Sequence, residues 1–213
     1  MDHCAFDQLL RKNVPHIMEN IFFSLDYKSF MSCHMVCTTW NKLLKSEYYV
    51  QKSRKMLAEN MIKLTDAIAK GDADKVRKII QRGMVDMNHD SGNLFTTLFG
   101  SSRKTEILKF LLQGGANPNV VIDGGGNTPL YCAVLAGQKD MAELLMDHGA
   151  SPQRVIPRLS YIRYSMDSDE KEAFQVILDR IPTPSQKDNK RINTQIAKFR
   201  KKFRKFYEFE RTT

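Results

Sequence analysis

One pattern of small and apolar residues occurs twice in this chain of 213 residues, and the two copies lie 66 positions apart. The matching residues of the first copy are Leu64, Ala67, Gly71, Val76, Ile79, Ile80 and Gly83. A further copy lies between them, with Leu98, Leu108 and Gly115 at comparable places. An offset of 66 is two periods of 33 residues, which is typical of arrays whose units are helix pairs stacked on their neighbours. We therefore expect an all-α solenoid.

Several residues indicate where these helices begin and end. Thr128 can cap a helix with Pro129 at its first position, where the missing N–H of proline costs nothing. Gly83, Gly115 and Gly149 stand where a residue in the left-handed conformation ends the second helix of a unit. A fourth unit lacks such glycines, as a terminal capping repeat can. Its apolar residues are Leu159, Tyr161, Ile162, Ala173, Phe174, Val176, Ile177 and Leu178.

The first 45 residues contain a different helical pattern. Pro15 suits the first position of a helix, and apolar residues then recur at helical spacing as far as Leu25. Asp26 can cap a second short helix, and a third contains Trp40. Three short helices of this size are near the lower limit for independent folding, so we expect this segment to complete its core against a partner chain.

This N-terminal segment resembles an F-box. The resemblance is carried by Val14-Pro15, by Leu25-Asp26 and by Val36-Cys37-x-x-Trp40, in the family's order and spacing, with Val14 in place of the usual leucine. The resemblance implies a docking module for the Skp-family adaptor of cullin ubiquitin ligases, with no catalytic residue of its own. The adaptor-binding residues that it suggests are Pro15, Ile17, Ile21, Leu25, Val36, Cys37, Trp40 and Leu43. The other interpretation of these residues is packing within the F-box, which we expect for Trp40 and Val36 in particular.

The repeats resemble ankyrin repeats, most clearly at Thr128-Pro129-Leu130-Tyr131. The family usually has histidine where this chain has Tyr131, so the hydrogen bonding between neighbouring repeats should differ here. The resemblance implies that turn tips and the first helices bind a protein substrate. The residues at those positions are Asn93, Phe95, Arg103, Lys104, Asn127, Leu135 and Tyr161. An exposed Phe95 or Leu135 would suit a binding anchor, whereas the alternative for several of them is solvation or packing between repeats.

Composition and motif searches argue against an enzyme. No apolar run is long enough to span a membrane, and four cysteines are too few for a disulfide scaffold, so we expect a reducing cytoplasmic or nuclear location. Cys33-His34-x-x-Cys37 has no second ligand pair nearby, as a zinc site would need. The Gly124-Gly125-Gly126 run lacks the Lys-Ser/Thr pair of a phosphate loop and is expected at a turn tip. We therefore expect no metal, no cofactor and no catalytic residue.

The C-terminal segment is strongly basic. From Pro184 to Thr213 there are ten Lys or Arg and three Asp or Glu, a net charge of +7 within a chain whose total is +9. Apolar residues recur there at steps of four and three, which predicts an amphipathic helix. They are Ile192, Ile196, Phe199, Phe203 and Phe206. Four interpretations stay open: a capping helix over the last repeat, an acidic partner, an anionic membrane surface, and nuclear import or nucleic acid, although the Phe stripe argues against a purely nucleic-acid-binding arm.

Together these patterns predict five segments: an N-terminal tail (1–13), an F-box (14–46), a helical linker (47–62), about four ankyrin repeats (63–183) and a basic amphipathic helix (184–213). The two resemblances imply the substrate-recognition subunit of a cullin-type (SCF) ubiquitin ligase, which binds a Skp-family adaptor and thereby cullin, and an unidentified protein substrate. The alternative is an ankyrin-repeat scaffold that acts outside ubiquitination, tethered by its basic tail to an acidic partner, a membrane or nucleic acid.

Overall fold

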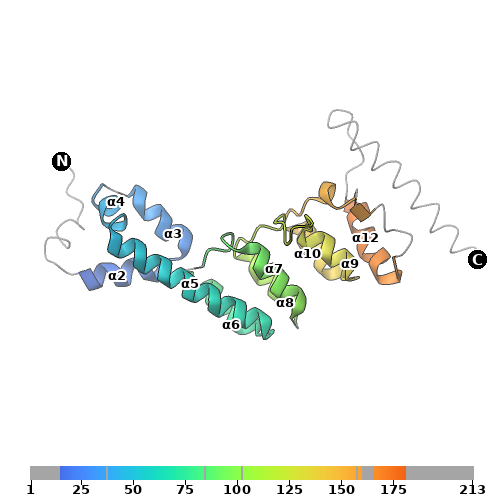
Figure 1. Ribbon diagram of the computed structural model, residues 1–213, viewed down its shortest axis with the longest axis horizontal. Coiled ribbons are helices and arrows are strands. Elements are labelled where there is room, and N and C mark those ends of the chain that lie inside the picture. The colour runs from blue at the N-terminus through green and yellow to red at the C-terminus, as the bar shows by residue number, and fades with distance from the viewer. Residues whose placement is uncertain are drawn as a thin grey trace, which may run out of the picture. The chain divides into compact units, whose positions relative to one another are not determined.

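The computed structural model describes residues 15–36, 38–83, 85–101, 103–156, 158–159 and 166–180, and all regular structure in these ranges is helical, as predicted (Figure 1). The chain divides into two compact units, Met1–Ala116 and Asn117–Thr213. The predicted amphipathic helix at 184–213 and the N-terminal tail at 1–13 lie outside the described residues.

The first unit begins with three short α-helices and one turn of 3-10 helix. These elements are α2 (Pro15–Ser24), α3 (Tyr27–Ser32), η1 (Cys33–Met35) and α4 (Thr38–Leu44). Pro15 is the first helical residue, as predicted. The Asp26 carboxylate caps α3 by accepting a hydrogen bond from the Ser29 backbone N–H, with an N···O distance of 2.8 Å. Both helix starts follow from local chemistry that the sequence shows directly.

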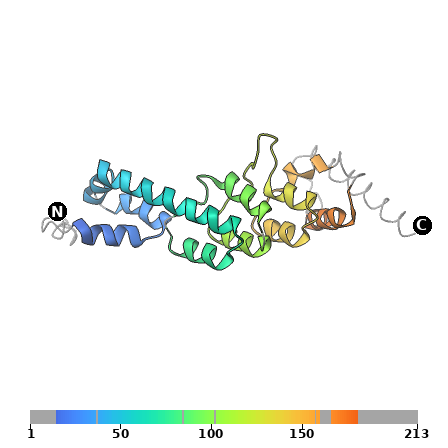
Figure 2. The ribbon, with the colours of Figure 1, turned by 60° about the horizontal axis from the view of Figure 1, so that its bottom comes forward.

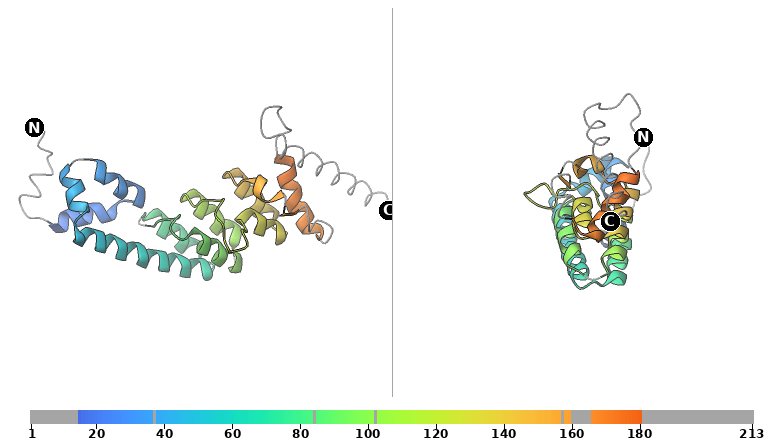
Figure 3. Two further views of the ribbon diagram at one scale, coloured as in Figure 1. Left: turned by 45° about the horizontal axis from the view of Figure 1, so that its top comes forward. Right: turned by 90° about the vertical axis from the view of Figure 1, so that its right-hand side faces the viewer.

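A helix of 23 residues, α5 (Glu47–Ala69), follows these short helices. Figure 3 (left) shows α2, α3 and α4 beside its N-terminal part. The Lys52 ammonium group on α5 pairs with the Glu19 carboxylate on α2, and it lies 5.3 Å from the centre of the Phe23 ring. The Tyr48 hydroxyl donates a second hydrogen bond to Glu19. This polar network joins α5 to α2.

The C-terminal part of α5 is also the first helix of the first repeat. This helix packs against α6 (Ala73–Gln81) and α7 (Ser91–Gly100) (Figure 2). The buried residues in its C-terminal part are Leu64, Ala67 and Ile68. The helix α8 (Lys104–Gln113) then packs against α6 and α7. Residues 47–62, expected as a linker, are therefore continuous in one helix with the start of the repeats.

The second unit contains the helix pair α9 (Pro129–Leu135) and α10 (Lys139–Asp147), the 3-10 turn η2 (Pro152–Arg154) and α12 (Ser168–Arg180). The helix α12 packs against both members of the pair. All five apolar residues predicted in the second helix of the degenerate fourth unit are buried in α12. They are Ala173, Phe174, Val176, Ile177 and Leu178.

The predicted helix ends are confirmed. Gly83, Gly115 and Gly149 have φ values of +90°, +91° and +85°, a left-handed conformation that strains any residue with a Cβ atom. Thr128 caps α9, and its hydroxyl accepts a hydrogen bond from the Tyr131 N–H at 3.4 Å, with Pro129 at the first position. Gly126 has φ +76° within the turn where the glycine run was expected.

Candidate functional site

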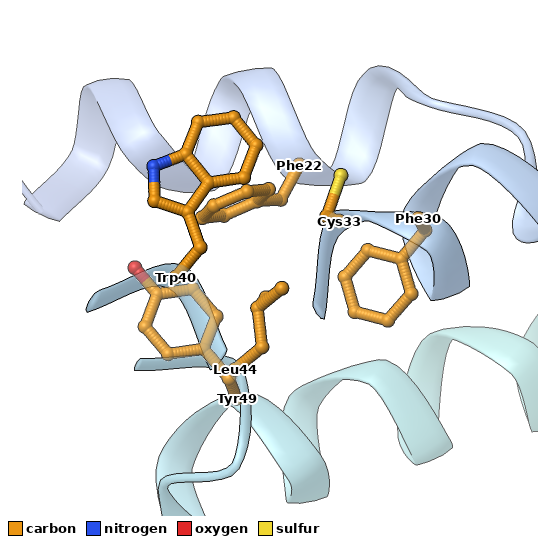
Figure 4. Close-up of a cluster of buried hydrophobic side chains, with 6 residues drawn as sticks. All are labelled: Phe22, Phe30, Cys33, Trp40, Leu44 and Tyr49. Atoms are coloured by element: carbon orange, nitrogen blue, oxygen red, sulfur yellow. The ribbon is translucent and has the colours of Figure 1, made fainter. Parts of the chain in front are cut away.

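The three short helices and the start of α5 surround one cluster of buried apolar side chains (Figure 4). The cluster consists of Phe22, Phe30, Cys33, Trp40, Leu44 and Tyr49. The edge-to-face contact between Phe22 and Trp40, with ring centres 5.0 Å apart, lies within it. Such aromatic contacts stabilise a small core beyond the area that they bury. Tyr49 on α5 also belongs to the cluster, so this core draws on the long helix as well as on the three short ones.

The structure divides the predicted adaptor-binding residues into different environments. Trp40 is buried, as its expected packing role requires, and Ile21, Leu25 and Leu43 are half-buried. Val36 was expected to pack inside but is 56% exposed, which corrects that expectation. Pro15 and Ile17 lie in α2, but their side chains are outside the described residues, as is all of Cys37.

Two methionines that were not predicted as site residues lie next to Val36. Met31 on α3 is 48% exposed, and Met35 on η1 is 83% exposed. These three exposed apolar residues lie within six consecutive positions, and we call them the α3–η1 patch. The helical spacing contains the signal for it, because Phe30 and Cys33 are three residues apart on the buried face while Met31 and Met35 are four apart on another. Exposed apolar patches on small modules mark interaction surfaces, and methionine is common at such surfaces.

The predicted substrate-binding residues in the first unit differ in accessibility. Phe95 is fully buried in α7, so the expectation of an exposed binding anchor at this position is wrong. Asn93 is exposed, and its amide donates a hydrogen bond to the Asp90 carboxylate at 3.1 Å. The Arg103 guanidinium pairs with Glu106 at 2.5 Å, and Lys104 beside it is half-buried.

In the second unit, Asn127 and Leu135 are half-buried, and Tyr161 lies outside the described residues. Asn127 belongs to a turn organised by Asp123, whose carboxylate accepts hydrogen bonds from the backbone N–H groups of Gly125 and Asn127. Hydrogen bonds from the backbone and side chain of Asn127 lower the pKa of Asp123. The predicted turn tip is therefore an ordered loop whose polar groups bind one another.

Tyr131 makes a contact that differs from the one expected of the family's histidine. The guanidinium carbon of Arg158 lies 4.5 Å from the centre of the Tyr131 ring, a cation–π arrangement. This contact joins the first helix of one repeat to the residues that follow η2. The position therefore keeps a role in connecting consecutive segments, although the chemistry of the connection has changed.

The described cysteine thiols are not activated. Burial raises the pKa of Cys33, and burial followed by the charge of Asp123 raises the pKa of Cys132. A thiol that stays protonated at neutral pH is a poor nucleophile. Among the residues that the structure describes, no group of three His, Cys, Asp or Glu side chains could hold a metal ion. No helix in the same part of the chain is long and apolar enough to cross a membrane.

Two family models match this chain. The F-box domain matches residues 14–52, and ankyrin repeats match residues 64–155 in three copies. The chain is therefore an F-box protein with ankyrin repeats, a combination of two domains that typically mediate protein interactions without catalysis. The predicted fourth unit lies beyond the matched repeats.

Similar proteins include the human 2-5A-dependent ribonuclease, which is 47% identical over 47 residues, covering 22% of this chain and 6% of the ribonuclease. Human receptor-interacting serine/threonine-protein kinase 4 is 43% identical over 58 residues, covering 27% of this chain and 7% of the kinase. The mouse 2-5A-dependent ribonuclease is 39% identical over 61 residues, covering 28% of this chain and 8% of the ribonuclease. The chain thus spans less than a tenth of the length of each of these relatives.

Proposed function

We propose that this protein is the substrate-recognition subunit of a cullin-type ubiquitin ligase of the SCF class. Its F-box binds a Skp-family adaptor, and its ankyrin repeats bind a protein substrate. The observation that carries the proposal is the presence of an F-box and ankyrin repeats in one chain, with the α3–η1 patch left exposed on the F-box. In this role the chain acts by binding, and the other subunits of the ligase perform the chemistry.

Proximity is the physical contribution of such a subunit. A bound substrate is held near the charged ubiquitin-conjugating enzyme, which raises the effective concentration of its lysine side chains. Specificity then depends on the repeat surface, because repeat arrays take different partners on one scaffold. The predicted contact residues that are accessible for this role are Asn93, Arg103, Lys104, Asn127 and Leu135.

Binding to the adaptor tests the proposal. The full chain is co-expressed with a Skp-family adaptor and analysed by size-exclusion chromatography. We expect Met35→Asp and Val36→Asp to abolish co-elution, because each places an unpaired carboxylate in an apolar interface. Ile62→Asp is the matched control, since Ile62 is an exposed apolar residue on α5 outside the F-box match, and this variant should bind like the wild type.

The outcomes separate two functions. Loss of the complex in the two patch variants alone supports the ligase subunit and assigns the adaptor surface. A wild-type chain that is folded and helical but forms no complex contradicts the proposal and leaves an ankyrin-repeat scaffold that acts outside ubiquitination.

A further inference from the structure

The N-terminus of α3, in the F-box, lies against the turn that ends α6, in the first repeat. The backbone N–H of Tyr27 donates a hydrogen bond to the carbonyl of Gly83, with an N···O distance of 2.7 Å. Gly83 is buried and lies 31 positions beyond the end of the F-box match at residue 52. The first repeat thus accepts a backbone hydrogen bond from a residue of the F-box.

The contact at Gly83 leaves no room for a side chain. A Cβ atom at this position would lie 2.4 Å from the Cα atom of Asp26 and 2.6 Å from its Cβ atom. The equivalent glycines of the next two repeats have almost the same φ values, but a Cβ atom at Gly115 or Gly149 would meet nothing within 4 Å. Glycine therefore has a second role in the first repeat, which is to let the F-box backbone approach.

A side-chain contact supports the same junction. The Asp86 carboxylate, which lies in the segment between α6 and α7, interacts electrostatically with the Tyr27 side chain. Burial, followed by the charge of Asp86, raises the pKa of Tyr27. We call the contacts of Asp26 and Tyr27 with Gly83 and Asp86 the α3–repeat junction.

The F-box is attached to the repeats at two places. One is α5, which contributes Tyr49 to the F-box core and Leu64, Ala67 and Ile68 to the core of the repeats. The other is the α3–repeat junction, on segments that α5 separates along the chain. Two attachments restrict movement of the F-box relative to the first repeats far more than a single connecting helix would, because a single helix could bend.

We propose that the F-box is the N-terminal cap of the repeat array and unfolds with the first repeats as one cooperative unit. Arrays of stacked repeats need a terminal element that covers the end of the stack, and no further repeat precedes α5 in the described residues. The cap is independent of what the F-box binds, so it does not rest on the ligase function. Its consequence for any partner is that the F-box and the first repeats keep a fixed mutual orientation.

The test compares two glycine substitutions in the full chain. Trp40 is the sole tryptophan and lies in the F-box core, so its fluorescence reports the unfolding of the F-box during urea titration. Gly83→Ala adds both backbone strain and a clash at the junction, whereas Gly115→Ala adds the same strain without the clash. We expect Gly83→Ala to raise the equilibrium constant of unfolding, measured by Trp40 fluorescence, at least about tenfold more than Gly115→Ala does. The reason is that the added methyl group overpacks a tight contact.

The proposal is overturned if Gly83→Ala and Gly115→Ala unfold at the same urea concentration, as measured by Trp40 fluorescence. The junction would then not contribute to the stability of the F-box. A milder pair of variants covers the case in which Gly83→Ala does not fold. Tyr27→Phe and Asp86→Ala are combined in a double-mutant cycle with the same readout. We expect the two to be coupled by more than about twofold in the unfolding constant, and additive effects would contradict the junction.

Discussion

At the scale of single residues, one F-box segment contains neighbours with opposite environments. Phe30 and Cys33 are buried, whereas Met31, Met35 and Val36 are exposed. The helical period explains the exposure of Met31 and Met35, because residues three or four apart share a face and residues one or two apart do not. It does not explain the exposure of Val36, which lies three residues after the buried Cys33. An apolar residue type alone therefore does not assign a position to the core.

Asp26 provides a prediction about pH at this scale. A hydrogen bond from the backbone N–H of Ser29, and then one from its side chain, lower the pKa of Asp26 in the folded protein. A lowered pKa means that the ionised form stabilises the fold at pH values above the unfolded pKa of about 3.9, and this contribution is lost as the pH falls through the folded pKa. The substitution Asp26→Asn keeps an acceptor for the cap but does not titrate.

We therefore expect the wild type to be more stable than Asp26→Asn at pH 7, and the difference to shrink as the pH falls below about 4. This difference in stability is measured by urea titrations, followed by Trp40 fluorescence, at several pH values. A difference that is the same at every pH would show that the charge of Asp26 contributes nothing to the cap.

At the scale of elements, α5 is shared by the two domains. The sequence separates a linker at 47–62 from the first repeat, but the helix runs without a break from Glu47 to Ala69. The absence of glycine and proline from this stretch allows the continuity. A continuous helix transmits orientation between its two ends, which a flexible linker does not.

The cap of α9 gives a prediction for one element. Thr128→Ala removes the hydroxyl that accepts the Tyr131 N–H, so we expect a loss of about 1 kcal/mol and faster hydrogen exchange in the first turn of α9. Thr128→Ser keeps the hydroxyl and is the matched control. Equal exchange in the alanine and serine variants would mean that the cap does not stabilise this turn.

At the scale of the whole molecule, the first unit joins the F-box to two repeats through α5 and the α3–repeat junction. A substitution that destabilises the core of the second repeat should therefore also destabilise the F-box. Leu98 is fully buried in α7, which packs against α5. We expect Leu98→Ala to destabilise this unit by about 2–5 kcal/mol and to lower the urea midpoint of Trp40 fluorescence.

The control for this prediction is Lys109→Ala, which truncates an exposed side chain on α8 and should leave the midpoint unchanged. A Trp40 midpoint that stays constant in Leu98→Ala, while circular dichroism shows loss of repeat helices, would show that the F-box unfolds separately from the repeats.

The sequence by itself determined the helical class, the repeat period, the helix caps and the two domain families. These features are local, because a cap or a left-handed glycine depends on residues within a few positions of it. Thr128, Asp26 and Gly83 could each be predicted from their immediate neighbours.

Only the tertiary structure decided which faces of the helices are buried. Phe95 is buried because α7 packs against both α5 and α8, and Val36 is exposed because no described helix covers it. The clash that forbids a side chain at Gly83 comes from Asp26, which is 57 positions earlier in the chain. Contacts between segments so far apart depend on how the helices pack, and the spacing of residues along the chain does not specify that packing.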